Sequence, residues 1–476
     1  MRCGVVLAAL ALAACAGPRA PPPPAAAVSA PGGWRDAPAT EGLVEPRWWS
    51  AFGDPVLAAI VERALANNTD VAIAAGRVEE ARAQFRFAEA QRLPNLFGLA
   101  AGGRQRDVSP FGRPREQTEG QAELRIAYDL DLFGRLAASS AAARETLLAT
   151  EAAQENVRLA VASSAASGYI TLRGLDARLD VLRETLASRE AALKVIRRRA
   201  EAGYGAMLDL RQAEADYHAT AQQIPVTELA IRRQEDGLSL LLGESPRAIE
   251  RGAATAVLAA PDIPPGLPSA LLRRRPDIAQ AERQLAAADR SLDAARAAFL
   301  PTVQLTATGG YVASNLLADE IGVFSLGGSV LAPIFDAGRL RAQQDAAVAR
   351  RDQAAFAYRK AALNAFREVE DALAAEDRLA EQERDLAAGR AALAEAYRLA
   401  TNRYRAGYSP YLDQLEVQRG LLNAELQLVQ ARTDRLNAAV ALYQALGGGW
   451  RATASERQPV SWQPTRQVRG ALGPGR

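Results

Sequence analysis

The feature that most constrains the fold of this chain is an internal repeat that spans almost its whole length. The repeated motifs lie 204 positions apart: Ala202-Gly203-Tyr204 and Ala406-Gly407-Tyr408, Gly134-Arg135-Leu136 and Gly338-Arg339-Leu340. A fixed period of this kind indicates two copies of one structural unit. We expect the first copy at residues 46–243 and the second at residues 269–447, joined by a linker at residues 244–268.

Each copy is expected to begin with a helix. Asp54 is suited to cap the first of these helices, and Pro55 fits its first position, where a backbone N–H is not needed. The helix should end before Pro94, because the residue before a proline is pushed out of the helical region. The helix of the second copy should end in the same way before Pro301.

A β-hairpin is predicted after each of these helices, because apolar residues fall at every second position. In the clearest case the apolar positions are Ala122, Leu124, Ile126, Tyr128, Leu130 and Leu132. A period of two gives a strand with one apolar face and one polar face. We expect hairpins at residues 95–132 and 302–334, with polar loops at residues 107–118 and 314–322.

Two very long helical hairpins are predicted at residues 137–243 and 340–447. Residues 137–200 include no proline, and a helix of roughly 60 residues spans about 90 Å. The returning helices have apolar residues at every seventh position, as in a coiled-coil seam. These are Leu210, Tyr217, Ile224, Ile231 and Leu238, and then Leu415, Leu422, Val429, Leu436 and Tyr443. Pro225 interrupts the first returning helix and should kink it.

The first residues are typical of an exported lipoprotein. We expect a signal peptide at residues 1–14, because its apolar run is too short to span a bilayer. Leu12-Ala13-Ala14-Cys15 resembles the bacterial lipoprotein processing box, in which the cysteine receives diacylglycerol and palmitate. Cys15 is therefore the expected lipid anchor, and no other cofactor is expected. Residues 15–45 are rich in proline and alanine and should form an extended spacer.

The predicted strands determine the expected fold class. No later stretch has about 18 uninterrupted apolar residues, so a membrane span would have to consist of strands. Four strands leave open edges, and closed membrane barrels need about eight or more. Three chains would supply about twelve. The sequence thus predicts an α+β membrane protein: a homotrimeric β-barrel that continues into a long helical coiled-coil barrel. The net charge of +2 gives no indication of a nucleic-acid partner.

Several motifs also resemble those of a known family. They are Trp48-Trp49, Phe52, Asp54-Pro55, Leu267-Pro268-Ser269, the run from Leu271 to Ile278, Phe299-Leu300-Pro301 and the two Ala-Gly-Tyr turns. Together they resemble the TolC/OprM-type outer-membrane efflux proteins, especially the NodT-like lipoprotein branch. The resemblance covers nearly all of residues 46–449, and residues 448–476 are expected to be a disordered tail.

The resemblance implies a duct in the outer membrane that performs no catalysis. It implies a homotrimer with a twelve-stranded barrel, a helical tunnel through the periplasm, and an equatorial domain built partly from the chain ends. The partners it implies are a periplasmic adaptor protein, an inner-membrane pump of the RND type, and the lipid of the outer membrane. The cargo would be drugs or other small molecules.

The two turns between the long helices are the predicted docking tip for the adaptor. Gly203 and Gly407 permit the positive φ that is needed where the chain reverses. Tyr204 and Tyr408 follow them as aromatic residues suited to contact a partner. The alternative is that both tyrosines only cover the helix ends.

The resemblance places a resting aperture just after the second turn. In the family a leucine and an acidic residue narrow it, and the matching residues are Leu412 and Glu416, although aspartate is more common at the second position. Residues four apart lie on one helix face, so three copies would form an apolar ring and an acidic ring. Asp413 and, from the first copy, Asp209 are further candidates. The alternative is that these acids are solvated on the outside of a helix.

Asp129 and Asp131 could face the lumen or mark the rim of the barrel, and His218 is expected on a helix surface. A duct for type I protein secretion would share this fold. A periplasmic adaptor or structural coiled-coil lipoprotein is the alternative from another class, but an adaptor would have a single helical hairpin. With two methionines and one histidine, a path lined with soft ligands for copper or silver is not expected.

Overall fold

The computed structural model describes residues 21–35, 44–108, 110–255 and 258–450. The expected signal peptide, Cys15 and most of the expected tail lie outside the described residues. The helices are α2 (Pro55–Asn67), α3 (Thr69–Ala90), α4 (Arg135–Glu201), α5 (Met207–Ala221), α6 (Gln223–Leu241), α7 (Pro268–Leu271), α8 (Pro276–Ala297), α9 (Arg339–Arg405) and α10 (Tyr411–Ala445), with 3-10 turns η2 (Pro24–Ala26) and η3 (Trp48–Phe52). The strands are β1 (Asn95–Val108), β2 (Pro114–Asp129), β3 (Thr302–Ser314) and β4 (Ile321–Leu331).

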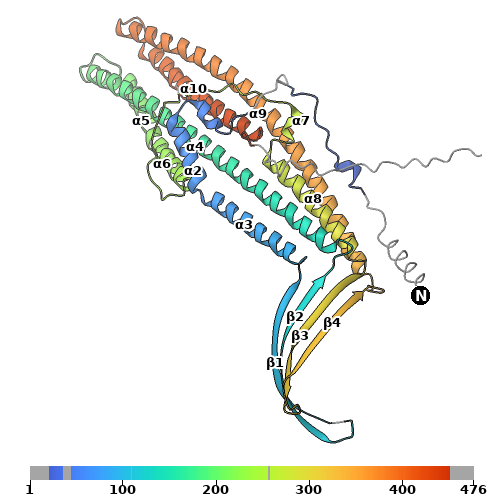
Figure 1. The fold of residues 1–476 in the computed structure, drawn as a ribbon. Coiled ribbons are helices and arrows are strands. Elements are labelled where there is room, and N and C mark those ends of the chain that lie inside the picture. The colour runs from blue at the N-terminus through green and yellow to red at the C-terminus, as the bar shows by residue number, and fades with distance from the viewer. Residues whose placement is uncertain (1–20, 36–43, 109, 256–257, 451–476) are drawn as a thin grey trace, which may run out of the picture.

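The molecule is elongated, with a β-sheet at one end and the turns of two helical hairpins at the other (Figure 1). The helices α4 and α9 have 67 residues each, which corresponds to about 100 Å. Along the shaft α3 packs on α4, α4 on α8, and α8 on α9, while α10 packs on both α9 and α4. The two predicted helical hairpins are thus confirmed, and they lie side by side.

The sheet has one apolar face because its register aligns the alternation of all four strands. The strands are antiparallel in the order β1-β2-β3-β4. Directly opposed residues point to the same face. One row across the sheet is Leu96, Ile126, Ala307 and Leu326, and the next is Gly98, Leu124, Gly309 and Phe324. The intervening rows of β2 and β3 carry mainly charged residues, glutamine and threonine, so the other face is largely polar.

Both β-hairpins are confirmed, but one loop prediction is wrong. Strands β1 and β2 stay paired up to Val108 and Pro114, so most of the predicted polar loop at residues 107–118 is strand. Polar side chains can continue a β-strand where both faces of the sheet meet solvent. The polar composition of residues 107–118 therefore did not mean that the strand had ended. The second loop, between Ser314 and Ile321, has nearly its predicted length.

The sheet joins the long helices through two acidic caps, which decides between the two possibilities for Asp131. Its carboxylate accepts hydrogen bonds from the backbone N–H groups of Leu136 (2.9 Å) and Ala137 (2.8 Å). Asp336 accepts one from Leu340 in the second repeat (2.8 Å). Asp129 ends β2 and pairs with Arg135 at 3.2 Å. Both predicted acids therefore lie at the junction with the helices, and Asp131 stabilises a helix start.

Two helices are interrupted. The first helix of repeat one is predicted to be continuous, but in the structure it breaks at Asn68. The Asn68 side chain accepts hydrogen bonds from Asp70 N (2.8 Å) and Val71 N (3.3 Å) and so begins α3. The expected kink at Pro225 is confirmed as a break at Gln222, between α5 and α6. A proline at position 225 cannot donate to the carbonyl of Ala221.

The middle of the shaft contains the main core, and segments from distant parts of the chain meet there. Trp48 stacks on Tyr443 with ring centroids 5.0 Å apart, which joins the start of repeat one to the end of repeat two. Trp34 is buried and donates to the carbonyl of Gly266 in the linker (2.9 Å). The described residues nearest the two chain ends and the linker therefore meet in one equatorial layer, as the family resemblance implied.

The described part of the spacer, residues 21–35, is extended apart from the turn η2, and it is not a free tether. Arg35 N donates to Glu370 (3.3 Å), Arg359 donates to the carbonyl of Ala25, and Arg351 donates to the carbonyl of Pro21 (3.3 Å). Going back along the chain, these contacts move along α9 towards its first residue, at the sheet. We call residues 21–35 the N-terminal strap.

The crossing of α4 and α10 gives a first prediction, for Gly174. A Cβ there would lie 2.9 Å from Cγ2 of Thr433 and closer still to its Oγ1. Gly174→Ala is therefore expected to lower the free energy of unfolding by about 1–3 kcal/mol through overpacking. Thr433→Ala should restore part of this loss in the double variant. Thermal unfolding of both variants would test it, and equal melting of Gly174→Ala and wild type would contradict it.

Candidate aperture at the helical tip

The two helix-to-helix turns have nearly the same structure. Gly203 and Gly407 have φ values of 75° and 78°, so the predicted positive φ is confirmed at both. In each turn the following tyrosine N–H bonds back across the helix end, from Tyr204 to the carbonyl of Arg199 and from Tyr408 to that of Arg403, both at 2.9 Å. This pattern satisfies the last carbonyls of a helix.

The tyrosines of both turns are almost fully solvated. Tyr204 is 89% exposed and Tyr408 is 80% exposed. Side chains of that exposure cover little of the helix ends, so the alternative in which they only shield those ends is not what the structure shows. They form the outermost aromatic surface of this end of the molecule.

The predicted aperture residues lie on the surface of the single chain. Leu412 and Glu416 are both exposed on the first turns of α10, and Asp413 is exposed beside Leu412. Asp209 is half-buried near the start of α5. The structure thus brings all three acids and the leucine to the tip end, and it places Leu412 and Glu416 on one face as the spacing predicted.

An ion pair that the sequence did not reveal ties the two hairpins together just below the tip. Arg419 of α10 donates from Nε to Oδ1 of Asp216 on α5 at 2.9 Å. Arg189 of α4 donates to the carbonyl of Asp216 (2.7 Å) and to Oγ1 of Thr220 (2.6 Å). We call Asp216, Arg419 and Arg189 the tip lock.

Asp216 and Arg189 of the tip lock are buried, Arg419 is exposed, and the set is incompletely paired. Asp216 is 5% exposed, and among the described residues its Oδ2 has no hydrogen-bond partner. Burial lowers the pKa of Arg189, although the charge of Asp216 opposes this. A buried charge that lacks part of its hydrogen bonding stabilises a structure weakly, and such a link can be broken at moderate cost. One feature of the sequence was consistent with this pair. Asp216 lies 13 residues after Gly203 and Arg419 lies 12 after Gly407, so both are at almost the same distance from the turns at the tip.

An aromatic cluster packs between the tip lock and the two helix-to-helix turns. Tyr404 and Tyr411 have ring centroids 5.5 Å apart, and the guanidinium of Arg199 lies 5.7 Å from the Tyr404 ring. Tyr411 is buried together with Leu415 and, from the first hairpin, Leu210. The cluster adds apolar contact between the hairpins to the ion pair. His218 is exposed on α5, as predicted.

The environment of Tyr411 gives a pH prediction. Burial, with the charge of Asp216 as a smaller cause, raises the pKa of Tyr411 to about 12. In the unfolded chain tyrosine titrates near about 10. Stability from the neutral hydroxyl is therefore present below about pH 10 and is lost as the pH rises towards 12. We expect this alkaline loss to shrink in Tyr411→Phe, measured as thermal stability between about pH 9 and pH 12. Identical profiles would contradict the assignment.

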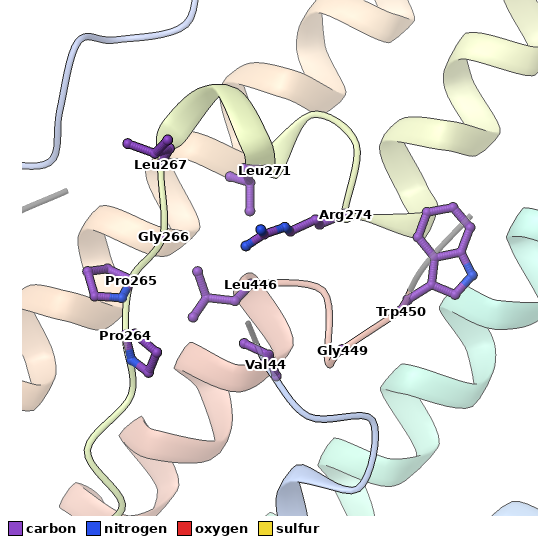
Figure 2. A pocket seen from close by; sticks show the side chains of 10 residues that line it. All are labelled: Val44, Pro264, Pro265, Gly266, Leu267, Leu271, Arg274, Leu446, Gly449 and Trp450. Carbon is purple, nitrogen blue, oxygen red and sulfur yellow. The ribbon is translucent and has the colours of Figure 1, made fainter. Parts of the chain in front are cut away.

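The equatorial layer has a small cavity of about 30 Å³, room for about one water molecule. Its lining comes from three separate segments: Val44, Pro264, Pro265, Gly266, Leu267, Leu271, Arg274, Leu446, Gly449 and Trp450. In Figure 2 Arg274 points into it, whereas the ring of Trp450 points away. The cavity is too small for a substrate and marks the joint between the linker and the chain ends.

Among the residues that the structure describes there is neither a candidate metal site nor a helix that could span a membrane. Those residues include no cluster of three or more histidine, cysteine, aspartate or glutamate side chains that could hold a metal. They also include no helix with the length and apolar character of a membrane span.

Comparison with known proteins agrees with this architecture. The model of the "Outer membrane efflux protein" family matches residues 60–244 and 267–448, one stretch in each repeat. The solvent efflux pump outer membrane protein SrpC of Pseudomonas putida is 38% identical over 420 residues, which cover 85% of this chain and 88% of SrpC. The pyoverdine export outer membrane protein OpmQ of P. putida is 35% identical over 466 residues, 94% of this chain and 97% of OpmQ.

A solved structure shares the whole fold. The MtrE outer membrane channel of Neisseria gonorrhoeae, determined in an open state, superposes with a TM-score of 0.78 at 29% identity and covers 91% of this chain and 98% of MtrE. The resemblance of individual motifs is therefore matched by the family model, by relatives along the chain and by the complete fold. This chain belongs to the outer membrane efflux protein family.

Proposed function

We propose that three copies of this chain form a closed channel through which an efflux pump discharges small molecules. Membership of the family makes the chain an outer-membrane efflux component, and the finer statements below are the proposal. The observation that carries it is the four-stranded sheet with one apolar face and two open edges, β1 and β4. Lipid cannot satisfy the backbone groups of an open edge, so the sheet must close with other copies.

The exposed apolar residues support closure around a three-fold axis. On the sheet Phe324 and Leu326 are 84% and 78% exposed, as expected for a face that meets lipid. On the shaft, exposed apolar residues lie on both flanking helices: Ile73 and Phe87 on α3, Phe356 and Leu363 on α9. These helices lie on opposite sides of the protomer (Figure 1). If the α3 side of one protomer contacts the α9 side of the next, the contacts repeat around a ring. Three copies then supply twelve strands.

The N-terminal strap supports a lipid anchor at Cys15. Arg351, whose side chain bonds the carbonyl of Pro21, lies 12 residues after the start of α9 and hence about 18 Å along the helix from the end that adjoins the sheet. Cys15 lies six positions before Pro21, and a segment of that length can span about 20 Å. Diacylglycerol and palmitate on Cys15 can therefore reach the edge of the bilayer in which the sheet lies.

The helical tip is the part we propose to contact the rest of the pump. Tyr204, Tyr408 and the two glycine turns form the surface for a periplasmic adaptor, with an RND-type pump in the inner membrane beyond it. Leu412 and Glu416, with Asp413 and Asp209 nearby, narrow the aperture. The relatives named for solvent efflux and for pyoverdine export carry different cargo, which favours a duct that passes what its pump delivers. Transport through it needs no catalysis by this chain.

Conductance in planar bilayers tests the proposal. Purified wild-type trimers are expected to give small, rarely open currents, and Leu412→Ala/Glu416→Ala is expected to give a large stable conductance, because both rings of the aperture are removed. Leu240→Ala/Glu244→Ala changes the same residue types far from the tip and should behave as wild type. Folded trimers that never conduct would refute the channel, whereas equal currents in all three proteins would refute only the aperture residues.

The alternatives are less well supported. A periplasmic adaptor or structural coiled coil would leave the apolar face of the sheet without a role. A duct for type I protein secretion would have the same fold, and the relatives named for efflux argue against it.

A further inference from the structure

The hairpin of β1 and β2 extends beyond the rest of the sheet (Figure 1). Pairing between β2 and β3 ends at Glu119 and Ser314, but β1 and β2 continue for five more pairs, from Arg104 opposite Thr118 to Val108 opposite Pro114. We call residues 104–118 the arm. It has four arginines against two acids, whereas the loop between β3 and β4 has two acids and no basic residue.

Two of the four arginines lie on the same face of the sheet as its apolar rows. Arg104 and Arg106 alternate in step with Leu96, Gly98 and Ala100 along β1, so all of them point to one side. The contacts confirm this, because Glu116 of β2 pairs with Arg104 at 2.7 Å and lies 3.8 Å from Arg106. Asp107 and Arg115 are opposed to each other on the other face.

Along the strand direction, these arginines lie just beyond the edge of the apolar band. Ala100 belongs to the last apolar row, with Ala122 and Tyr311. Arg104 follows four residues later, about 13 Å along the strand. In a barrel whose strands are tilted by about 40°, this is roughly 10 Å above the last apolar row. That position corresponds to the headgroup layer of the leaflet away from the helices.

We propose that Arg104 and Arg106 form a binding site for the phosphorylated headgroups of lipids in the outer leaflet of the outer membrane. The inference rests on the proposed function, which places the sheet in that membrane. The side chains of Arg104 and Arg106 are 72% and 70% exposed. Their planar guanidinium groups match the geometry of a phosphate, with two parallel N–H donors each.

The charges that the arm carries on this face favour an anion. Two guanidinium groups share one carboxylate, so the group of Arg104, Arg106 and Glu116 has one net positive charge in each chain. The 3.8 Å separation between Arg106 and Glu116 is too long for a hydrogen bond, which leaves the Arg106 guanidinium oriented by charge alone. A phosphate between the two arginines would complete the set and hold the arm against the membrane surface.

The test measures lipid binding to the full-length trimer in detergent by native mass spectrometry. The probes are diphosphorylated lipid A and the same lipid without its phosphates. Wild type should prefer the phosphorylated form, and Arg104→Gln/Arg106→Gln should bind it less tightly by about fivefold for each arginine removed. Glu116→Gln removes the competing carboxylate and should strengthen binding. Arg115→Gln, the matched control on the opposite face of the arm, should bind as wild type.

Three results of the binding measurement would overturn the proposal. They are equal binding of both lipid forms, equal loss in Arg115→Gln, and competition by millimolar inorganic phosphate as strong as that of the lipid. Dissociation of the Arg104→Gln/Arg106→Gln trimer without lipid would also overturn it and would assign the arginines to contacts between protomers, for instance with the acidic loop after β3. Bilayer conductance of the same samples separates failure of this site from failure of the channel. If Arg104→Gln/Arg106→Gln trimers conduct and bind the phosphorylated lipid as wild type does, this site is refuted and the channel stands.

Discussion

Arg419→Ala is expected to shift the tip towards its open form by about 30-fold. The substitution removes the guanidinium that donates to Oδ1 of Asp216, and with it the ion pair that links α10 to α5. Arg419 is 47% exposed and Asp216 is 8% exposed at its side chain, so the loss lies between values for surface and buried pairs, at about 2 kcal/mol. A free-energy change of that size alters a two-state equilibrium about 30-fold.

The measurement is the open probability of single channels in planar bilayers. Arg211→Ala is the matched control, because Arg211 lies on the same helix as Asp216 but pairs with Glu214 three residues away, inside one hairpin (2.7 Å). It should leave the open probability unchanged. If Arg211→Ala and Arg419→Ala open the channel equally, any loss of charge at the tip has this effect and the tip lock has no special role.

Asp54→Ala is expected to cause the largest loss of stability. Asp54 is 2% exposed, and it accepts hydrogen bonds from Val56 N (2.8 Å), Ala253 N (3.0 Å) and the hydroxyl of Tyr169 (3.0 Å). The hydroxyl in turn accepts from Gly252 N (2.8 Å). One carboxylate thus caps α2 and also holds the linker between the repeats to the shaft.

The expected cost is about 3–7 kcal/mol. Loss of the cap contributes about 1 kcal/mol, and each buried donor left without an acceptor contributes about 1–3 kcal/mol. Burial raises the pKa of Tyr169 to about 12, so its hydroxyl stays protonated at neutral pH and keeps its need for an acceptor. Thermal unfolding and limited proteolysis of residues 244–268 would show the loss.

Two variants sharpen this test. Asp54→Asn keeps an oxygen for the cap but turns an amide NH₂ group towards donors, so its stability should be intermediate. Asp70→Ala removes an exposed aspartate from the first turn of α3, where it makes no such network, and should have little effect. If Asp70→Ala and Asp54→Ala melt together, the hydrogen-bond network is not what stabilises the equatorial layer.

Local patterns in the sequence were sufficient for much of the architecture. The glycines at positions 203 and 407 and the prolines at 94, 225 and 301 punctuate the chain through their own backbone preferences, and the elements end where they predict. Alternation along β2 is sufficient to predict the apolar face without the register of the strands. The same local patterns were misleading at Asn68, where a side chain that caps a second helix resembled a residue inside a longer one.

The sequence by itself determined the two repeats, the long helices, the four strands and the positions of the tip residues, because each of these depends on periodicity or on the conformational limits of glycine and proline. Only the tertiary structure decided that Asp216 pairs with Arg419 and that Asp54 holds the linker. It also decided that the N-terminal strap follows α9. These contacts join residues roughly 200 to more than 300 positions apart. Periodicity shows that a face is buried, but the partner that buries it is set by how the two repeats pack.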